Sequence, residues 1–188
     1  WVWSARPQVI SLAMFAALAY VLYLYKWRSI DRLWLVPALM LVWSNLHGGY
    51  VLGAMLLVTA LGGELLNHLG GEAEAALSWR KLLRLGGWSV AAGLAVLLNP
   101  NGVDTWLIPF QTVGVKALQQ FIAEWASPDF HDVAQQPLLW MLFGLFAAVG
   151  FSRRRLGGGD FLAVLVFGYA ALVARRNFGP FALVSGPV

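Results

Sequence analysis

The sequence has no cysteine and little charge, and each shortage excludes a class of function. Without cysteine there is no disulfide framework, no thiolate zinc site and no thiol chemistry in these 188 residues. Only 12% of the residues are charged, about half the share in an average soluble domain, whereas 60% are hydrophobic. The sequence also lacks a GxSxG elbow, a phosphate-binding P-loop, an HExxH zinc motif and a GxGxxG fingerprint. A soluble hydrolase or nucleotide-binding domain is therefore not supported.

Long apolar runs take the place of these missing features. Charges gather in short clusters separated by apolar stretches of roughly 14 to 20 residues, the length of helices that cross a bilayer. We therefore predict an all-α fold, a polytopic transmembrane helical bundle that forms a single domain over residues 1–188, with about six to seven spans. The expected spans cover 7–25, two segments within 33–66, 82–98, 137–151, 161–174 and the stretch from 178. Residues 99–136 should form an outer loop, with 106–110 and 118–125 in the membrane interface.

The basic residues predict how this bundle is oriented. Most of the 13 fall on one predicted side, which the positive-inside rule makes cytoplasmic. That side holds Lys26, Arg28, Arg32, Arg80, Lys81, Arg84, Arg153, Arg154 and Arg155, and the other holds Arg6, Lys116, Arg175 and Arg176. All ten tryptophans lie near predicted span ends, as an aromatic belt requires. Because these loops explain the net charge of +4, we predict a lipid bilayer and no nucleic acid as partner.

Polar residues from five separate parts of the chain fall on the predicted outer side. Ionisable groups at membrane depth are costly unless they are paired or functional, so their convergence predicts a polar site there. The candidate binding residues are Arg6, Gln8, Asn45, His47, Asn99, Asn101, Trp125, Arg175, Arg176 and Asn177.

The Arg175-Arg176 pair is the most informative of these candidates. It departs from the positive-inside trend at the outer end of a short apolar stretch, which predicts an anionic partner. A guanidinium group binds phosphate oxygens in a bidentate manner, so a lipid phosphate or diphosphate is one interpretation. The other is that the side chains reach ordinary lipid phosphates or pair with a loop carboxylate. Arg6 allows the same two interpretations.

Two short motifs bring amide and imidazole side chains to the outer side. In Trp43-Ser44-Asn45-Leu46-His47-Gly48-Gly49, His47 could act in acid-base catalysis or donate to a phosphate, beside glycines that allow close approach of a ligand. Alternatively, Asn45 and His47 satisfy the carbonyl groups of a tight turn. The second motif, Asn99-Pro100-Asn101-Gly102, is more typical of a turn than of a site.

The segment from Ile122 to Asp132 holds three carboxylates and a histidine. Glu124 or Asp129 could serve as a base, and Trp125 could stack on a sugar ring. Asp129, His131 and Asp132 could together bind a divalent metal, although their spacing matches no strong metal motif, so we predict no certain cofactor. The alternative is a charged loop that only contacts water at the membrane surface.

The remaining acidic residues and one glycine pair have structural interpretations. Glu64, Glu72, Glu74 and Asp160 fall on the cytoplasmic side, where we expect them to be solvated or to cap helices, Asp160 as N-cap of the span from 161. Gly49 and Gly53 have the GxxxG spacing that lets two helices approach closely. The chain begins without a methionine and stops within an apolar stretch, so we expect a piece of a longer protein.

These motifs together resemble a group of poorly characterised bacterial membrane proteins. The residues that carry the resemblance are Arg6-Pro7-Gln8, the motif from Trp43 to Gly49, Asn99-Pro100-Asn101-Gly102, Glu124 to Phe130, and Arg175-Arg176-Asn177. The group is placed with the GT-C glycosyltransferases, near the protein mannosyltransferase and aminoarabinose transferase types. The resemblance implies transfer of a sugar from a polyprenyl-phosphate carrier to an acceptor, at the outer face of the bacterial cytoplasmic membrane.

The resemblance also divides the roles among the candidates. In GT-C enzymes the main acidic residue lies in the first outer loop, so the catalytic base is expected upstream of this chain, and Glu124, Asp129 and His47 are the catalytic candidates within it. The arginines would hold the carrier phosphate and stabilise the charge of the leaving group. A transporter or flippase for an anionic lipid or sugar phosphate is the main alternative, and a non-catalytic membrane scaffold is a third.

Overall fold

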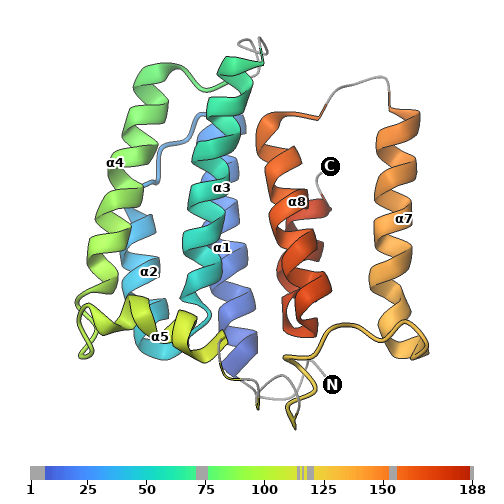
Figure 1. Cartoon of the computed structure of the whole chain (residues 1–188). Coiled ribbons are helices and arrows are strands. Elements are labelled where there is room, and N and C mark those ends of the chain that lie inside the picture. Colours follow the sequence, from blue (N-terminus) through green and yellow to red (C-terminus); the bar gives the residue numbers. More distant parts are fainter. Residues whose placement is uncertain are drawn as a thin grey trace.

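The computed structural model describes residues 7–70, 76–113, 115, 117, 121–152 and 156–186, and within these ranges every regular element is a helix. The all-α prediction is therefore confirmed for the described residues (Figure 1). The helices are α1 (Pro7–Trp27), α2 (Leu35–Leu46), α3 (Tyr50–Leu69), α4 (Trp79–Val96), α5 (Asp104–Val113), α7 (Gln136–Phe151), α8 (Gly158–Val173) and α9 (Phe178–Ser185). Two short 3₁₀ helices, η1 (Val133–Gln135) and η2 (Arg175–Asn177), lie beside them.

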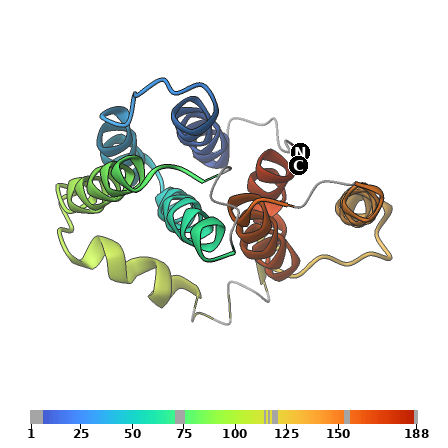
Figure 2. The same cartoon turned by 90° about the horizontal axis from the view of Figure 1, so that it is seen from above.

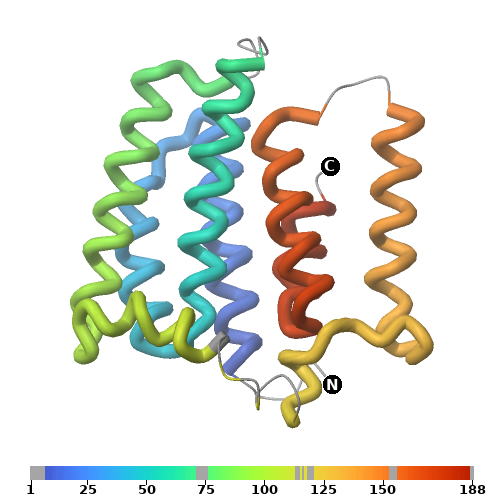
Figure 3. Tube along the Cα trace, in the orientation of Figure 1, coloured from blue at the N-terminus to red at the C-terminus, as the bar shows by residue number. Residues whose placement is uncertain are grey.

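The long helices run up and down between two ends of the molecule. Helices α1 to α4 form one group, α3 packs along α8, and α7 stands apart from the rest (Figures 1 and 2). Helix α5 lies across the lower end in Figure 1, which agrees with the predicted interfacial piece at 106–110. The tube in Figure 3 follows residues 121–135 along this same end before α7 rises from it. Of the other predicted interfacial piece, 118–120 lie outside the described residues, and 123–126 form turns.

Among the described residues, three elements are long and apolar enough to cross a membrane: α1, α3 and the continuous stretch Val133–Phe151 that ends in α7. Helices α2 and α8 are apolar but shorter, about 18 and 24 Å at 1.5 Å per residue, against a hydrocarbon core of about 30 Å. Helix α4 carries three basic residues in its first two turns. The predicted number of spans, six to seven, is therefore not confirmed. The helices nevertheless begin and end close to the predicted bounds of those spans.

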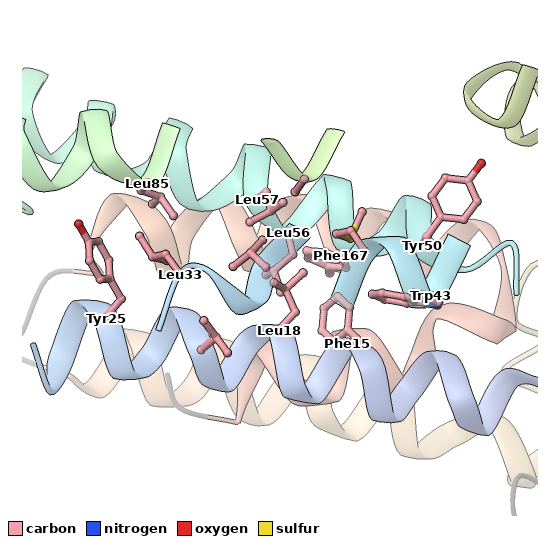
Figure 4. Close-up of a cluster of buried hydrophobic side chains, with 14 of the residues drawn as sticks. Phe15, Leu18, Tyr25, Leu33, Trp43, Tyr50, Leu56, Leu57, Leu85 and Phe167 are labelled. Carbon is pink, nitrogen blue, oxygen red and sulfur yellow. The ribbon is translucent and has the colours of Figure 1, made fainter. Parts of the chain in front are cut away.

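The core lies between α1, α2, α3 and α8 (Figure 4). Phe15 of α1 meets Phe167 of α8 edge to face, with ring centroids 5.2 Å apart. Trp43 is fully buried in α2, so it belongs to the core and not to the aromatic belt that the sequence predicted. Gly53 explains how α3 comes so close to α2, because a Cβ atom at residue 53 would lie 2.7 Å from the Trp43 ring. The predicted close approach at the GxxxG motif is confirmed.

Helices α3 and α8 meet at a seam of glycines. A Cβ atom on Gly63 would lie 2.2 Å from the Cα atom of Gly159, so the backbones touch there. Asn67 fixes the contact, since its side-chain oxygen accepts a hydrogen bond of 2.6 Å from the Gly158 N–H group. The predicted N-cap at Asp160 is wrong: α8 begins earlier because the glycines can enter the seam, and its N-cap is Gly157.

Candidate functional site: a polar cluster at one end of the bundle

The predicted outer residues do lie at one end of the bundle, the lower end in Figure 1. Helices α1, α3, α7 and α9 begin there, and α2, α4 and α8 end there. The described candidates at this end are Gln8, Asn45, His47, Asn99, Asn101, Glu124, Trp125, Asp129, His131, Asp132, Arg175, Arg176 and Asn177. Arg6 lies outside the described residues. The antiparallel order of the helices is what gathers residues so distant in sequence.

Arg176 and three other candidates form a cluster, which we call the arginine cluster: Gln8, Glu124, Trp125 and Arg176. The Arg176 guanidinium group lies over the Trp125 ring, 4.3 Å from its centroid. The backbone N–H of Arg176 donates to the Glu124 carbonyl oxygen at 3.1 Å, and the Gln8 amide donates to the Glu124 carboxylate. The first turn of α1, the loop before η1 and the η2 helix are thereby joined.

Burial and charge act in opposite directions on Arg176. Burial lowers the pKa of Arg176 from its ordinary value, and the negative charge of Glu124 raises it. Arginine keeps its proton at any physiological pH, so the half-buried side chain remains a cation. A cation held over an aromatic ring, with a carboxylate nearby, is a fixed positive group at the end of the bundle.

His47 lies at the same end of the bundle, within the electrostatic range of Arg176, and is held from the core side. Its Nδ1 atom is 2.6 Å from the Ser11 hydroxyl oxygen and accepts a hydrogen bond from the Gly49 N–H at 3.2 Å. Burial lowers the pKa of His47 from 6.5, and the positive charge of Arg176 lowers it further. His47 is therefore neutral near pH 7 and within the electrostatic field of Arg176.

The Asn45 and Asn99 side chains bind groups at the end of α2 and in the turn that follows α4. The Asn45 amide donates to the Leu41 carbonyl oxygen at 2.9 Å, and the Asn99 amide donates to the Ser44 carbonyl oxygen at 2.9 Å. The Asn99 side chain also accepts from the Asn101 N–H at 3.0 Å. Gly102 has a positive φ of 55°, as the predicted turn requires. The structural interpretation of this turn is confirmed, and Asn45 supports the end of α2.

The carboxylates of residues 129–132 are also engaged locally. Asp129 accepts from the His131 N–H at 3.0 Å, and Asp132 accepts from the Ala134 N–H at 3.0 Å and the Gln135 amide at 2.7 Å. These hydrogen bonds, first that from Gln135, lower the pKa of Asp132. Over the part of the chain that the structure describes, no group of three or more metal-binding side chains comes together.

Arg175 and Asn177 flank Arg176 but bind backbone groups. The Arg175 side chain donates to the Ser127 carbonyl oxygen at 3.3 Å. The Asn177 amide donates to the Ala170 carbonyl oxygen at 2.9 Å and so satisfies the end of α8. Of the two adjacent arginines, only Arg176 stacks on Trp125, and the sequence alone did not distinguish them.

Two residues of the site were missed from the sequence, Ser11 and Trp43. The Trp43 indole N–H donates to the Ser11 hydroxyl oxygen at 2.8 Å, and that hydroxyl contacts His47. Ser11 is buried on the same face of α1 as Phe15 and Leu18. A hydroxyl four residues before a core phenylalanine was the pattern that could have revealed it, because i and i+4 share a helix face.

The opposite end of the bundle holds a buried ion pair that contradicts one prediction. Glu64 was expected to be solvated, but its side chain is only 3% exposed and lies 2.8 Å from the Lys26 ammonium group. Its other oxygen accepts from the Leu77 N–H at 2.7 Å. A cavity of about 170 Å³ lies beside this pair. Glu64 is buried because α1 ends next to α3 and supplies the lysine that compensates its charge.

The fold and the site define a helical protein whose described part contains three candidate membrane spans and a polar cluster at one end. The chain matches no known protein family, and neither the curated proteins nor the solved structures include a significant match.

Proposed function

We propose that this protein is a membrane-embedded glycosyltransferase of the GT-C type, which transfers a sugar from a polyprenyl-phosphate donor to an acceptor. The observation that carries the proposal is the position of Arg176, a half-buried cation that lies over Trp125 and beside Glu124 at one end of a helical bundle, with His47 in its electrostatic range. A cation fixed in this way binds a phosphate with little further loss of side-chain entropy.

The cluster suggests a role for each side chain. Arg176 binds the carrier phosphate and stabilises the negative charge that grows on it as the sugar leaves. His47, neutral and close to Arg176, donates a hydrogen bond to the same phosphate. Glu124 orients Arg176 and, with Trp125, contacts the sugar or the acceptor. The bond that breaks joins the anomeric carbon to the phosphate oxygen, which leaves with the electron pair. The acceptor oxygen forms the new bond to the anomeric carbon as its proton passes to a carboxylate base, for which Glu124 and Asp129 are the candidates in this chain.

An apolar groove supports a donor with a lipid tail. It has a volume of about 380 Å³ and lies between α3, α5 and α8. Its walls include Val51 and Met55 of α3, Trp106 and Phe110 of α5, and Val166 of α8. Helix α5 lies at the same end of the bundle as the arginine cluster, so a lipid with its phosphate at that end can extend along apolar side chains (Figure 1).

The proposal includes the topology. Six to seven helices, including the short α2, α8 and α9, enter the bilayer of the bacterial cytoplasmic membrane, and the arginine cluster faces outward. Support comes from the basic residues that the structure describes, most of which lie at the end opposite the cluster. Thinning of the bilayer or snorkelling of flanking residues accommodates helices that are too short.

The test is sugar transfer by the intact protein in liposomes, with undecaprenyl-phosphate-linked hexoses as probe donors. Arg176→Ala should reduce transfer on the order of a hundredfold or more, because one well-placed donor to the leaving oxyanion is lost. Arg84→Ala is the matched control, since Arg84 belongs to the predicted opposite side and pairs with Asp31 at 2.7 Å. It should keep the rate of the unmodified protein. Unchanged transfer by Arg176→Ala would remove Arg176 from the mechanism.

A second function, transport of an anionic lipid or sugar phosphate, is favoured by the buried Lys26–Glu64 pair. Ionisable residues between membrane helices commonly mark a pathway for ions or substrates. The same liposomes separate the two functions if they also contain a fluorescent lipid phosphate. Movement of this lipid between leaflets, without release of sugar from any probe donor, would replace the glycosyltransferase by a transporter.

A further inference from the structure

A chain of three polar side chains leads from the core to His47, a residue within the electrostatic range of Arg176. It begins at Trp43, which is fully buried, passes through Ser11, which is 6% exposed, and ends at the half-buried His47. The two contacts measure 2.8 Å between Trp43 Nε1 and Ser11 Oγ, and 2.6 Å between Ser11 Oγ and His47 Nδ1. We call these three residues the Trp–Ser–His chain.

The chemistry of the donors fixes the direction of each hydrogen bond. An indole N–H can only donate, so Ser11 accepts from Trp43 and has its single hydroxyl proton left for His47. The backbone N–H of Gly49 also donates to Nδ1 of His47. An atom that accepts these bonds carries a lone pair, and the proton of the neutral ring must then be on Nε2.

The same geometry excludes Ser11 as a nucleophile. In a serine–histidine pair the hydroxyl is exposed to the substrate, whereas Ser11 lies under the backbone of α3. A Cβ atom on Gly49 would be 2.2 Å from the Ser11 oxygen, so nothing fits between them. The Trp43 indole N–H donates a hydrogen bond to the same Ser11 oxygen. The hydroxyl therefore supports His47 and does not react.

We propose that Trp43 and Ser11 are positioning residues, which hold His47 as the neutral Nε2–H tautomer so that it donates a hydrogen bond to the anion bound by Arg176. His47 then acts as a donor and not as the general base. This donor role rests on the proposed function, whereas the tautomer rests on the Trp–Ser–His chain alone. Burial and the charge of Arg176 support it, because both lower the pKa of His47 and keep the ring neutral.

The test of the tautomer is ¹⁵N NMR of the intact protein with labelled histidine rings, in nanodiscs at pH 7.5 without ligand. His68→Gln and His131→Gln remove the other two histidines, so only His47 is observed. We expect an unprotonated Nδ1 and a protonated Nε2. Ser11→Ala should raise the protonation midpoint of His47 and increase the Nδ1–H form, because one donor to Nδ1 is lost.

Two further variants keep this experiment decisive. Trp43→Phe retains a ring in the core but removes the indole donor, and should change the His47 signals in the same direction as Ser11→Ala. Ser44→Ala is the matched control, since the Ser44 hydroxyl donates to the Leu41 carbonyl oxygen and should leave the signals unchanged. An imidazolium or an Nδ1–H ring in the unmodified protein would overturn the proposal, and so would identical spectra for Ser11→Ala and its parent.

Addition of undecaprenyl phosphate tests the donor role. A shift of the Nε2 signal that is absent in Arg176→Ala is the expected result. If this lipid binds in an Arg176-dependent manner but leaves Nε2 unchanged, the donor role of His47 is wrong and the proposed function stands. If the lipid does not bind even to the unmodified protein, the proposed function and the donor role fail together, and only the tautomer stands.

Discussion

Single atoms decide the geometry at the end that holds the arginine cluster, and Gly49 shows this most clearly. Its φ of −70° is one that alanine adopts readily, so the backbone does not require glycine there. The requirement comes from space, because a methyl group would meet the Ser11 oxygen at 2.2 Å and lie 3.1 Å from His47 Nδ1. Neither atom can move away without loss of the Trp–Ser–His chain.

Gly49→Ala should therefore destabilise the protein by about 1–3 kcal/mol, the usual cost of overpacking a well-packed site. Gly48→Ala is the matched control, since a methyl group at the neighbouring position meets nothing within 4 Å. The measurement is thermal or urea unfolding of both variants in the same detergent. Equal stability of the two variants would show that α3 and Ser11 can separate at no cost.

Much of the site could be predicted at the scale of residues, but only for side chains with unusual chemistry. Arg176, Glu124 and His47 are conspicuous because they are ionisable groups beside apolar runs. Ser11 and Trp43 were missed because a serine within a span and a tryptophan near its end are both ordinary. Their importance depends on the hydrogen bond that joins α1 to α2. Its two residues are 32 positions apart in the sequence, so no local pattern reveals it.

At the scale of elements, the helices could be predicted to within a few residues, whereas their partners could not. Apolar runs and breaks such as Gly48-Gly49 define where a helix begins and ends. No pattern in the sequence indicated that α3 packs on α8, because in lipid the choice of partner depends on close packing of small residues across the chain. The seam of Gly63 with Gly158 and Gly159 became evident only from the coordinates.

Gly63→Ala should weaken the α3–α8 pair by about 1–3 kcal/mol, since the new methyl group would meet backbone atoms of Gly159 that cannot rotate away. The absence of cysteine allows a direct measurement by oxidative cross-linking of Gly62→Cys with Leu162→Cys, since a Cβ atom at residue 62 would lie 3.1 Å from a Leu162 methyl group across the seam. The cross-link should form more slowly in Gly63→Ala. Gly87→Ala, with nothing near the added atom, should leave its rate unchanged.

At the scale of the whole molecule, polarity differs between the two ends. The arginine cluster and the loop that holds Asp129 and Asp132 lie at one end, and the Lys26–Glu64 pair lies near the other. At both ends a basic side chain has an acidic partner within the protein, Arg176 with Glu124 at one end and Lys26 with Glu64 at the other. The predicted orientation in the membrane therefore depends on the distribution of lysine and arginine among the loops, to which the positive-inside rule applies.

Cysteine labelling tests this orientation. Ser127→Cys at the predicted outer end should react with a membrane-impermeant maleimide in intact cells, and Ser78→Cys should react only after permeabilisation. Both serines are exposed, so access to the reagent depends on the side of the membrane. The reverse pattern would invert the topology, and labelling of both residues in intact cells would contradict a spanning bundle.

The glycine seam between α3 and α8 also has a consequence for biosynthesis. Helix α3 leaves the ribosome long before α8, and at about 5–20 residues per second the delay is on the order of ten seconds. During this time the Gly63 face of α3 has no partner within the chain, and the acceptor of Asn67 has no Gly158 donor. The early helices therefore keep this face unpaired within the chain until α8 is made. The last helices thus complete a surface that the first ones already present.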